Sequence, residues 1–193
     1  MEKSSLRHIM AMAGLTVGIL AALVVVVEQS RRAAAEPDIG LNEALAGMGV
    51  TPGSGEAAGF ELESLDGMTQ TLSDYEDEVV FLNFWATWCA PCVEEMPAMQ
   101  VLADELEEKG LSVVAVNVRE DREQVVEFVE MLELEYTVLL DRDGQATRDF
   151  NVRGYPTTII VGRDGSLIGT KLGYHDWDDP ETLEAFAALL EQV

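Results

Sequence analysis

The sequence predicts an α/β domain with a central mixed β-sheet flanked by helices. Short apolar runs of strand length alternate with longer segments in which apolar residues recur every three or four positions. This alternation favours a sheet covered by helices, and a hairpin signal near the C-terminus makes that sheet mixed. The 193 residues suffice for one such domain and one additional segment.

Six segments have the composition and spacing of strands. The first alternates polar and apolar residues, as an edge strand does, and Asp66-Gly67 then turns the chain. The second and third are continuous apolar runs, typical of strands buried on both faces. The last two flank Arg163-Asp164-Gly165, a hairpin signal. The six predicted strands cover residues 60–65, 79–85, 111–118, 137–140, 157–161 and 166–172.

Helices are predicted between these strands and at the C-terminus. The helix after the second strand runs from Pro91 to Lys109, where Gly110 ends it. The final helix has Asp179 as its N-cap and Pro180 at its first position. Further helical segments are expected over 38–48, around 125–132, and for one or two turns before residue 150.

The N-terminal region contains an apolar segment long enough to cross a membrane. Residues 9–27 carry no charge, and as a helix they would span roughly 28 Å, close to the thickness of a bilayer's hydrocarbon core. We expect an uncleaved transmembrane helix; a cleaved signal peptide is the alternative, because Ala33-Ala34-Ala35 offers a small-x-small site. The expected division is a cytoplasmic N-terminus (1–8), an anchor (9–27), a linker (28–58) and a folded domain (59–193).

The charge balance excludes one class of partner. The chain has 36 acidic residues against 12 lysines and arginines, a formal net charge of −24. Phosphate backbones bind to basic surfaces, so we expect no nucleic-acid partner. Two basic residues stand on each side of the apolar segment, so the positive-inside rule leaves its orientation open.

Both cysteines of the chain lie in one tetrad, Cys89-Ala90-Pro91-Cys92, between a predicted strand and a predicted helix. Two thiols at this spacing can form and reopen a disulfide, which indicates thiol–disulfide exchange. Cys89 precedes the helix, whose N-terminus stabilises a thiolate, so we predict that Cys89 is the attacking nucleophile. Cys92 lies one turn deeper and would resolve the mixed disulfide, and Pro91 stiffens the turn.

Two other interpretations of the tetrad are a permanent structural disulfide and half of a zinc site. Zinc would need two more soft ligands, but the chain has no other cysteine. Its two histidines are His8 and His175, and His175 is expected to be exposed. We therefore expect no metal and no cofactor other than the redox-active disulfide.

Exchange also needs a group that takes the proton of Cys92. Glu95 lies three residues further along the predicted helix on the same face, and burial beside the thiols would raise its pKa. We predict that Glu95 relays the proton; the alternative is a solvated surface acid. Trp85 and Trp88 are expected to be packing and rim residues beside the thiols.

The dipeptide Tyr155-Pro156 directly precedes a predicted strand. One interpretation is a cis-proline loop that faces the cysteines and whose free backbone groups pair with an extended peptide. Trp88, Tyr155 and Pro156 would then bind the substrate. The other interpretation is a trans proline that starts an edge strand.

Three motifs occur together: WATWCAPC at 85–92, Glu95-Met96-Pro97, and RGYPTT at 153–158. In combination they resemble the thioredoxin superfamily, and within it the membrane-anchored TlpA/ResA-type thiol–disulfide oxidoreductases of bacteria. The resemblance covers roughly residues 60–193. It implies a thioredoxin fold in which Pro156 is cis and opposite Cys89 and in which Pro97 kinks the active-site helix.

The resemblance also bears on two polar residues. Thioredoxin itself has a buried aspartate six residues before its first cysteine, where this chain has Asn83. TlpA/ResA-type proteins share the asparagine and have a glutamate at the position of Glu95, which implies a relay role for Glu95 and a structural, hydrogen-bonding role for Asn83. One departure is Ala57-Ala58-Gly59-Phe60, where relatives often have an Ala-Pro-Asp-Phe-like start.

The resemblance implies a protein-disulfide reductase tethered to the cytoplasmic membrane, with its domain in the periplasm or at the cell exterior. Its client would be an exported protein such as apocytochrome c, and a membrane thiol donor would re-reduce the cysteines. Three alternatives stay open: an oxidase or isomerase of secreted proteins, a peroxiredoxin-like antioxidant activity, and a non-catalytic module whose cysteines form a staple.

Overall fold

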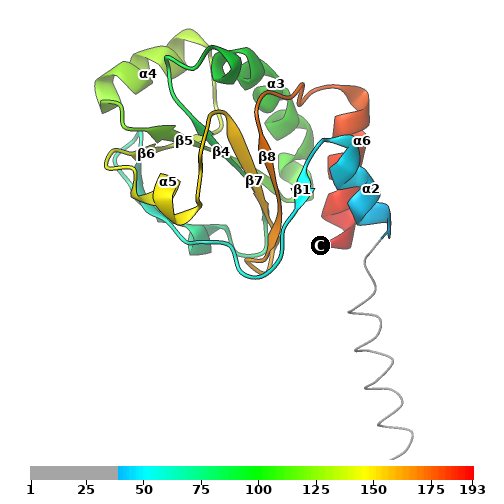
Figure 1. Cartoon of the computed structure of the whole chain (residues 1–193). Coiled ribbons are helices and arrows are strands. Elements are labelled where there is room, and N and C mark those ends of the chain that lie inside the picture. The colour runs from blue at the N-terminus through cyan, green and yellow to red at the C-terminus, as the bar shows by residue number, and fades with distance from the viewer. Residues whose placement is uncertain (1–38) are drawn as a thin grey trace, which may run out of the picture. The chain divides into compact units, whose positions relative to one another are not determined.

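An eight-stranded mixed β-sheet forms the centre of the structure, a computed structural model that describes residues 39–193 (Figure 1). In chain order the strands are β1 Thr51–Pro52, β2 Glu61–Ser64, β3 Thr69–Thr71, β4 Val79–Trp85, β5 Leu111–Val118, β6 Thr137–Asp141, β7 Thr157–Val161 and β8 Leu167–Leu172. They lie side by side in the order β1-β8-β7-β4-β5-β6-β2-β3. Because β4, β5 and β6 pair in parallel and the other neighbours are antiparallel, the predicted mixed sheet is confirmed.

Helices cover both faces of this sheet. The α-helices are α2 Ile39–Gly47, α3 Ala90–Leu106, α4 Arg122–Met131, α5 Gln145–Asp149 and α6 Pro180–Gln192. The apolar cluster on one face of the sheet includes residues of α2, α3, α4 and α6. The cluster on the other face is covered by α5 and by a 3-10 helix over Leu72–Tyr75. This is the layered α/β arrangement that the alternating sequence pattern predicts.

β4 is the central strand and positions the start of α3. All seven of its side chains are buried, as its continuous apolar sequence predicts. Phe81 and Trp85 belong to one apolar cluster, and Leu82 and Phe84 belong to the other, so both faces of the strand are held. α3 continues through a 3-10 turn to Gly110, whose φ of +91° is the left-handed conformation that glycine adopts without strain.

The first predicted strand is not at a sheet edge. β2 lies between β6 and β3, so its expectation as an edge strand is wrong, whereas the turn at Asp66-Gly67 is confirmed. The edge strand on this side of the sheet is β3, which the sequence does not predict. Its three residues are Thr-Gln-Thr, too short and too polar to stand out.

The folded unit begins before residue 59, where the sequence places the end of a linker. Leu45 and Met48 on and after α2 and Val50 before β1 are buried in the core, and β1 pairs with β8. Figure 1 shows α2 lying beside α6. The segment predicted as an anchor, 9–27, lies outside the described residues; within 39–193 no helix is both long and apolar enough to span a bilayer.

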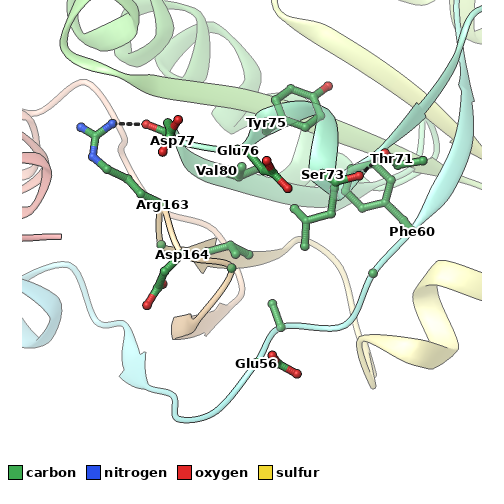
Figure 2. Close-up of a pocket in the computed structure, with 16 residues that line it drawn as sticks. Glu56, Phe60, Thr71, Ser73, Tyr75, Glu76, Asp77, Val80, Arg163 and Asp164 are labelled. Carbon is green, nitrogen blue, oxygen red and sulfur yellow. Dashed lines mark hydrogen bonds between the residues drawn. The ribbon is translucent and has the colours of Figure 1, made fainter.

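A hollow of about 570 Å³ lies near the start of β4 and the turn between β7 and β8 (Figure 2). Phe60 and Tyr75 line it, together with acidic side chains such as Asp164. It lies at the end of the sheet opposite to the one at which β4 leads to Cys89. The hollow is therefore separate from the cysteine pair.

Arg163, at the rim of this hollow, joins three segments of the chain. Its guanidinium donates to the Asp77 carbonyl just before β4, which Figure 2 shows as a dashed line. It also donates to the Lys109 carbonyl at 3.2 Å. In the C-terminal segment it donates to the Leu190 carbonyl at 3.4 Å and to the Val193 carbonyl at 3.0 Å. A planar group with several donors suits this arrangement better than an ammonium would.

Replacing Arg163 with alanine should therefore lower the free energy of unfolding by about 1–3 kcal/mol, since several carbonyls lose a charged donor. Arg163→Lys should recover only part of this loss. Urea denaturation monitored by circular dichroism measures both effects. Arg153→Ala is the control, because the Arg153 guanidinium contacts Asn151 of its own loop, and it should change stability by less than about 0.5 kcal/mol. Equal losses in the two alanine variants would contradict the joining role of Arg163.

Candidate active site

The cysteine pair lies where β4 passes into α3, and it forms a disulfide in this structure. The two sulfurs are 2.07 Å apart and the two Cα atoms 5.3 Å apart. Cys89 is the N-cap of α3, with extended backbone, and Pro91 lies in the first helical turn. Proline suits this position because its missing N–H has no helical partner there. Cys89 is 5% exposed and Cys92 fully buried, so an incoming group meets Cys89 first.

The position of Cys89 also favours its ionised form after reduction. The first backbone N–H groups of a helix point outward and carry partial positive charge. The N–H of Cys92 donates to the Cys89 carbonyl at 3.0 Å, which fixes the first turn against the N-cap. A thiolate on Cys89 would therefore lie at the positive end of α3, a 17-residue helix. Pro97 lies inside the same helix, and the kink predicted there stays a prediction.

The turn that precedes Cys89 is held by Glu120. The Glu120 carboxylate accepts hydrogen bonds from the Thr87 backbone N–H at 2.7 Å and from the Thr87 hydroxyl at 2.6 Å. Asn117, at the end of β5, donates to the same carboxylate at 2.7 Å. These contacts attach the cysteine turn to the neighbouring strand, a role that the sequence does not indicate for Glu120.

Glu95 is buried in the core beside the cysteines, with only 1% of its surface exposed. Asn83 donates to its Oε1 at 2.7 Å. The backbone N–H of His175 and the indole Nε1 of Trp177 both donate to its Oε2, each at 3.2 Å. Burial raises the pKa of Glu95 to about 7, although these hydrogen bonds and the charge of Lys171 oppose the rise. The surface-acid alternative is thereby excluded by geometry.

Asn83 lies under Glu95 at the centre of the sheet. Its Nδ2 also donates to the Thr158 hydroxyl at 3.1 Å, across the pairing of β4 with β7. Its Oδ1 is buried and has no hydrogen-bond partner among residues 39–193. The amide therefore has acceptor capacity to spare beside the carboxyl.

The Tyr155-Pro156 peptide bond is cis, so the trans alternative is wrong. Pairing of Phe84 with Thr157 brings Pro156 to the end of the sheet from which β4 continues to Cys89. Trp88 is 69% exposed, and its ring meets the ring of Tyr155 edge to face with the centroids 5.8 Å apart. The exposed Trp88 and the half-buried Tyr155 form an aromatic surface beside Cys89. Trp85, by contrast, is fully buried, as expected of a packing residue.

The loop between β8 and α6 completes the site, which the sequence does not indicate. His175, expected to be exposed, is only partly so; its ring Nε2 lies 2.8 Å from the Thr182 hydroxyl. Trp177 is fully buried and meets the Phe81 ring edge to face at 4.7 Å. Trp177 lies between Asp176 and Asp178, and a large apolar residue between two acidic ones is the sequence feature that could have indicated a buried side chain in this loop. No group of side chains within 39–193 is arranged to hold a metal ion.

These features define a class: thioredoxin-fold proteins with a cysteine pair at the start of a helix, beside a cis-proline loop. Residues 54–169 match the AhpC/TSA family, and the chain belongs to this family. The predicted resemblance to ResA-type proteins is confirmed. The chain is 40% identical over 111 residues to the thiol-disulfide oxidoreductase ResA of Geobacillus kaustophilus, a match covering 58% of this chain and 64% of that protein.

Two further comparisons agree. The chain is 40% identical over 121 residues to the thioredoxin-like protein YneN of Bacillus subtilis, covering 61% of this chain and 70% of that protein. The crystal structure of a thiol:disulfide interchange protein DsbE from Chlorobium tepidum superposes with a TM-score of 0.66 at 32% identity, covering 72% of this chain and 99% of that one. The predicted thioredoxin fold is confirmed. The chain spans slightly less than two thirds of the length of the ResA proteins of Geobacillus kaustophilus and Bacillus thuringiensis that it matches.

The raised pKa of Glu95 has a consequence for stability. In the folded state Glu95 has a pKa of about 7, whereas its ordinary pKa is 4.5. Between these pH values the folded state binds the proton more tightly than the unfolded state does, so the free energy of unfolding falls as the pH rises. Glutamine cannot ionise, so the free energy of unfolding of Glu95→Gln, relative to that of the parent, should rise by about 2–3 kcal/mol from pH 5 to pH 8.

Urea denaturation of the oxidised protein at the two pH values measures this difference. Glu94→Gln, the same substitution at the exposed neighbouring residue, is the control and should leave the difference near zero. A Glu95→Gln difference that does not change with pH would show that the carboxyl is already ionised at pH 5.

Proposed function

We propose that this chain is a thiol–disulfide oxidoreductase that reduces disulfides of exported proteins. The observation that carries the proposal is that Cys89 is the N-cap of α3, whereas Cys92 and the Glu95 carboxyl are buried further along the same helix. The names of the ResA and DsbE proteins to which the chain is similar support the same chemistry. The aromatic surface of Trp88 and Tyr155 gives a client peptide a place to bind.

The reaction proceeds by two exchanges. The Cys89 thiolate attacks one sulfur of the client disulfide, forming a mixed disulfide and releasing the second client sulfur as a thiolate. Cys92 then loses its proton to the Glu95 carboxylate and attacks the Cys89 sulfur. The client leaves with both sulfurs reduced, and two electrons have passed from the cysteine pair, which is left as a disulfide. A thiol donor must reduce it again for the next cycle.

Asn83 serves the carboxyl in both of its protonation states. Its Nδ2 donates to the ionised Glu95 Oε1. When Glu95 carries the proton, a half-turn of the amide places the unpartnered Oδ1 where it accepts the new O–H. An aspartate at this position would compete for the proton, whereas an asparagine supports Glu95 without titrating.

The proposed client and location rest on the N-terminal sequence and on the family resemblance. Residues 9–27 would tether the domain to the membrane, and a tether raises the effective concentration of membrane partners. We propose that the domain works outside the cytoplasm, that a membrane thiol donor re-reduces it, and that apocytochrome c is among its clients. The backbone of Tyr155 makes no hydrogen bond within residues 39–193 and would pair with the extended client.

A trapping experiment tests the exchange. Cys92→Ala leaves Cys89 able to attack but removes the group that resolves the mixed disulfide, so a covalent complex with a peptide disulfide should accumulate. Non-reducing electrophoresis and mass spectrometry identify it, and Cys89→Ala should give no complex. A protein that reduces peroxide but forms no complex with a disulfide would be the antioxidant alternative. A pair that resists reduction and shows no insulin-reductase activity would be a structural staple.

The direction of exchange is tested by the reduction potential of the cysteine pair. A reductase requires a value well below that of strong oxidants, which lie near about −120 mV. Equilibration with glutathione buffers, followed by alkylation and mass spectrometry, measures the potential. A value close to the oxidant limit would favour the oxidase or isomerase alternative.

A further inference from the structure

The loop between β8 and α6 supplies two of the three donors on the Glu95 carboxyl. The His175 backbone N–H and the Trp177 indole N–H both donate to Oε2, from positions 80 and 82 residues further along the chain. Oε1 accepts from Asn83 alone among the described residues. The two oxygens of the carboxyl are therefore unequally occupied.

This difference decides where a proton can be added. Each oxygen of an ionised carboxylate has two lone pairs that accept hydrogen bonds. Both positions on Oε2 are used by His175 and Trp177, whereas Oε1 keeps one open. A proton from Cys92 therefore enters at Oε1, the oxygen that also faces Asn83.

The Trp177 donor is held firmly in place. Its indole ring is fully buried and packs edge to face on Phe81 at 4.7 Å and on the His175 ring at 4.6 Å. Asp179, two residues later, caps α6 by accepting from the backbone N–H groups of Glu181 and Thr182. The loop is thus fixed at the helix start as well as in the core.

We propose that Trp177 is a positioning residue for the proton relay: with the His175 amide it occupies Oε2 of Glu95 and directs the Cys92 proton to Oε1. The inference rests on the proposed function, because it concerns the same exchange. It adds Trp177, a residue that acts on the exchange through its hydrogen bond to the Glu95 carboxyl.

Other titratable groups also face the carboxyl. Lys171 on β8 favours the ionised form of Glu95, and the buried Tyr136 before β6 has its own pKa raised, first by burial and then by the charge of Glu95. Burial lowers the pKa of the His175 ring, so that ring is neutral at pH 7 and above. Burial, then the charges of Asp176 and Glu94, and then the charge of Glu95 raise the pKa of Tyr174 in the same loop. All of these groups are retained when only the Trp177 side chain is replaced.

Removing the Trp177 donor should make Glu95 a weaker acid. Hydrogen bonds that end on a carboxylate stabilise its ionised form, so loss of one raises the pKa of Glu95. A charged hydrogen bond corresponds to a shift of about one pH unit. The relay would then accept a proton efficiently only at a higher pH.

A two-phase reaction isolates the step concerned. The reduced full-length chain is mixed with one equivalent of 4,4′-dithiodipyridine, a chromogenic small disulfide. Attack by Cys89 releases the first thiopyridone at a rate that depends on concentration. Attack by Cys92 on the mixed disulfide releases the second at a rate that does not. The pH midpoint of the second phase reports the relay.

Trp177→Phe should move this midpoint upward by about one pH unit and slow the second phase at pH 7 by about five-fold. The matched control is Trp85→Phe, since the Trp85 indole N–H is also buried but has no hydrogen-bond partner among residues 39–193. It should leave the midpoint at the parental value. Identical midpoints in the two variants would overturn the inference.

A second variant covers the case in which Trp177→Phe does not fold. Incorporation of 3-benzothienylalanine at position 177 keeps the shape of the indole but replaces N–H with sulfur, and the same upward shift is expected. An unshifted midpoint in this variant would also overturn the inference. Absence of the first phase in the parental protein would instead contradict the proposed function, so the two failures are distinguishable.

Discussion

Burial of the Glu95 carboxyl between β4 and α3 is the constraint on which the rest of the site depends. A carboxyl group in an apolar interior is stable only where hydrogen-bond donors replace water. Here they come from Asn83, 12 residues earlier in the chain, and from a loop about 80 residues later. The site is therefore complete only when the central strand, the cysteine helix and the C-terminal segment have all come together.

The contacts around the start of α3 also give the two cysteines different exposure to solvent. β4 is buried along its whole length, so the point at which it passes into α3 is fixed relative to the sheet. Glu120 holds the turn from one side, and the cis-proline loop lies at the same end of the sheet. Cys89 keeps a small exposed fraction, 5%, whereas Cys92 is fully buried, which is the asymmetry that ordered exchange needs.

Local features of the sequence predict most of this arrangement. Continuous apolar runs predict β4 and β5, the tetrad predicts the cysteine turn, and helical spacing places Glu95 on the face of Cys92. What the sequence does not indicate depends on distant contacts. Trp177 and His175 meet Glu95 only through the tertiary fold. The sequence predicts a helix over 38–48 but assigns it to a linker, whereas α2 lies against α6 and β1 pairs with β8.

The two edges of the sheet limit how an extended polypeptide can bind to this protein. β1 has two residues and β3 has three, so each edge exposes few unpaired backbone groups. A long open edge would recruit an extended polypeptide by strand addition and lead to aggregation. With edges this short, the proposed contact with a client would fall to the aromatic rings and the Tyr155 backbone beside the cysteine pair. A client bound in this way would be able to dissociate once its sulfurs had been exchanged.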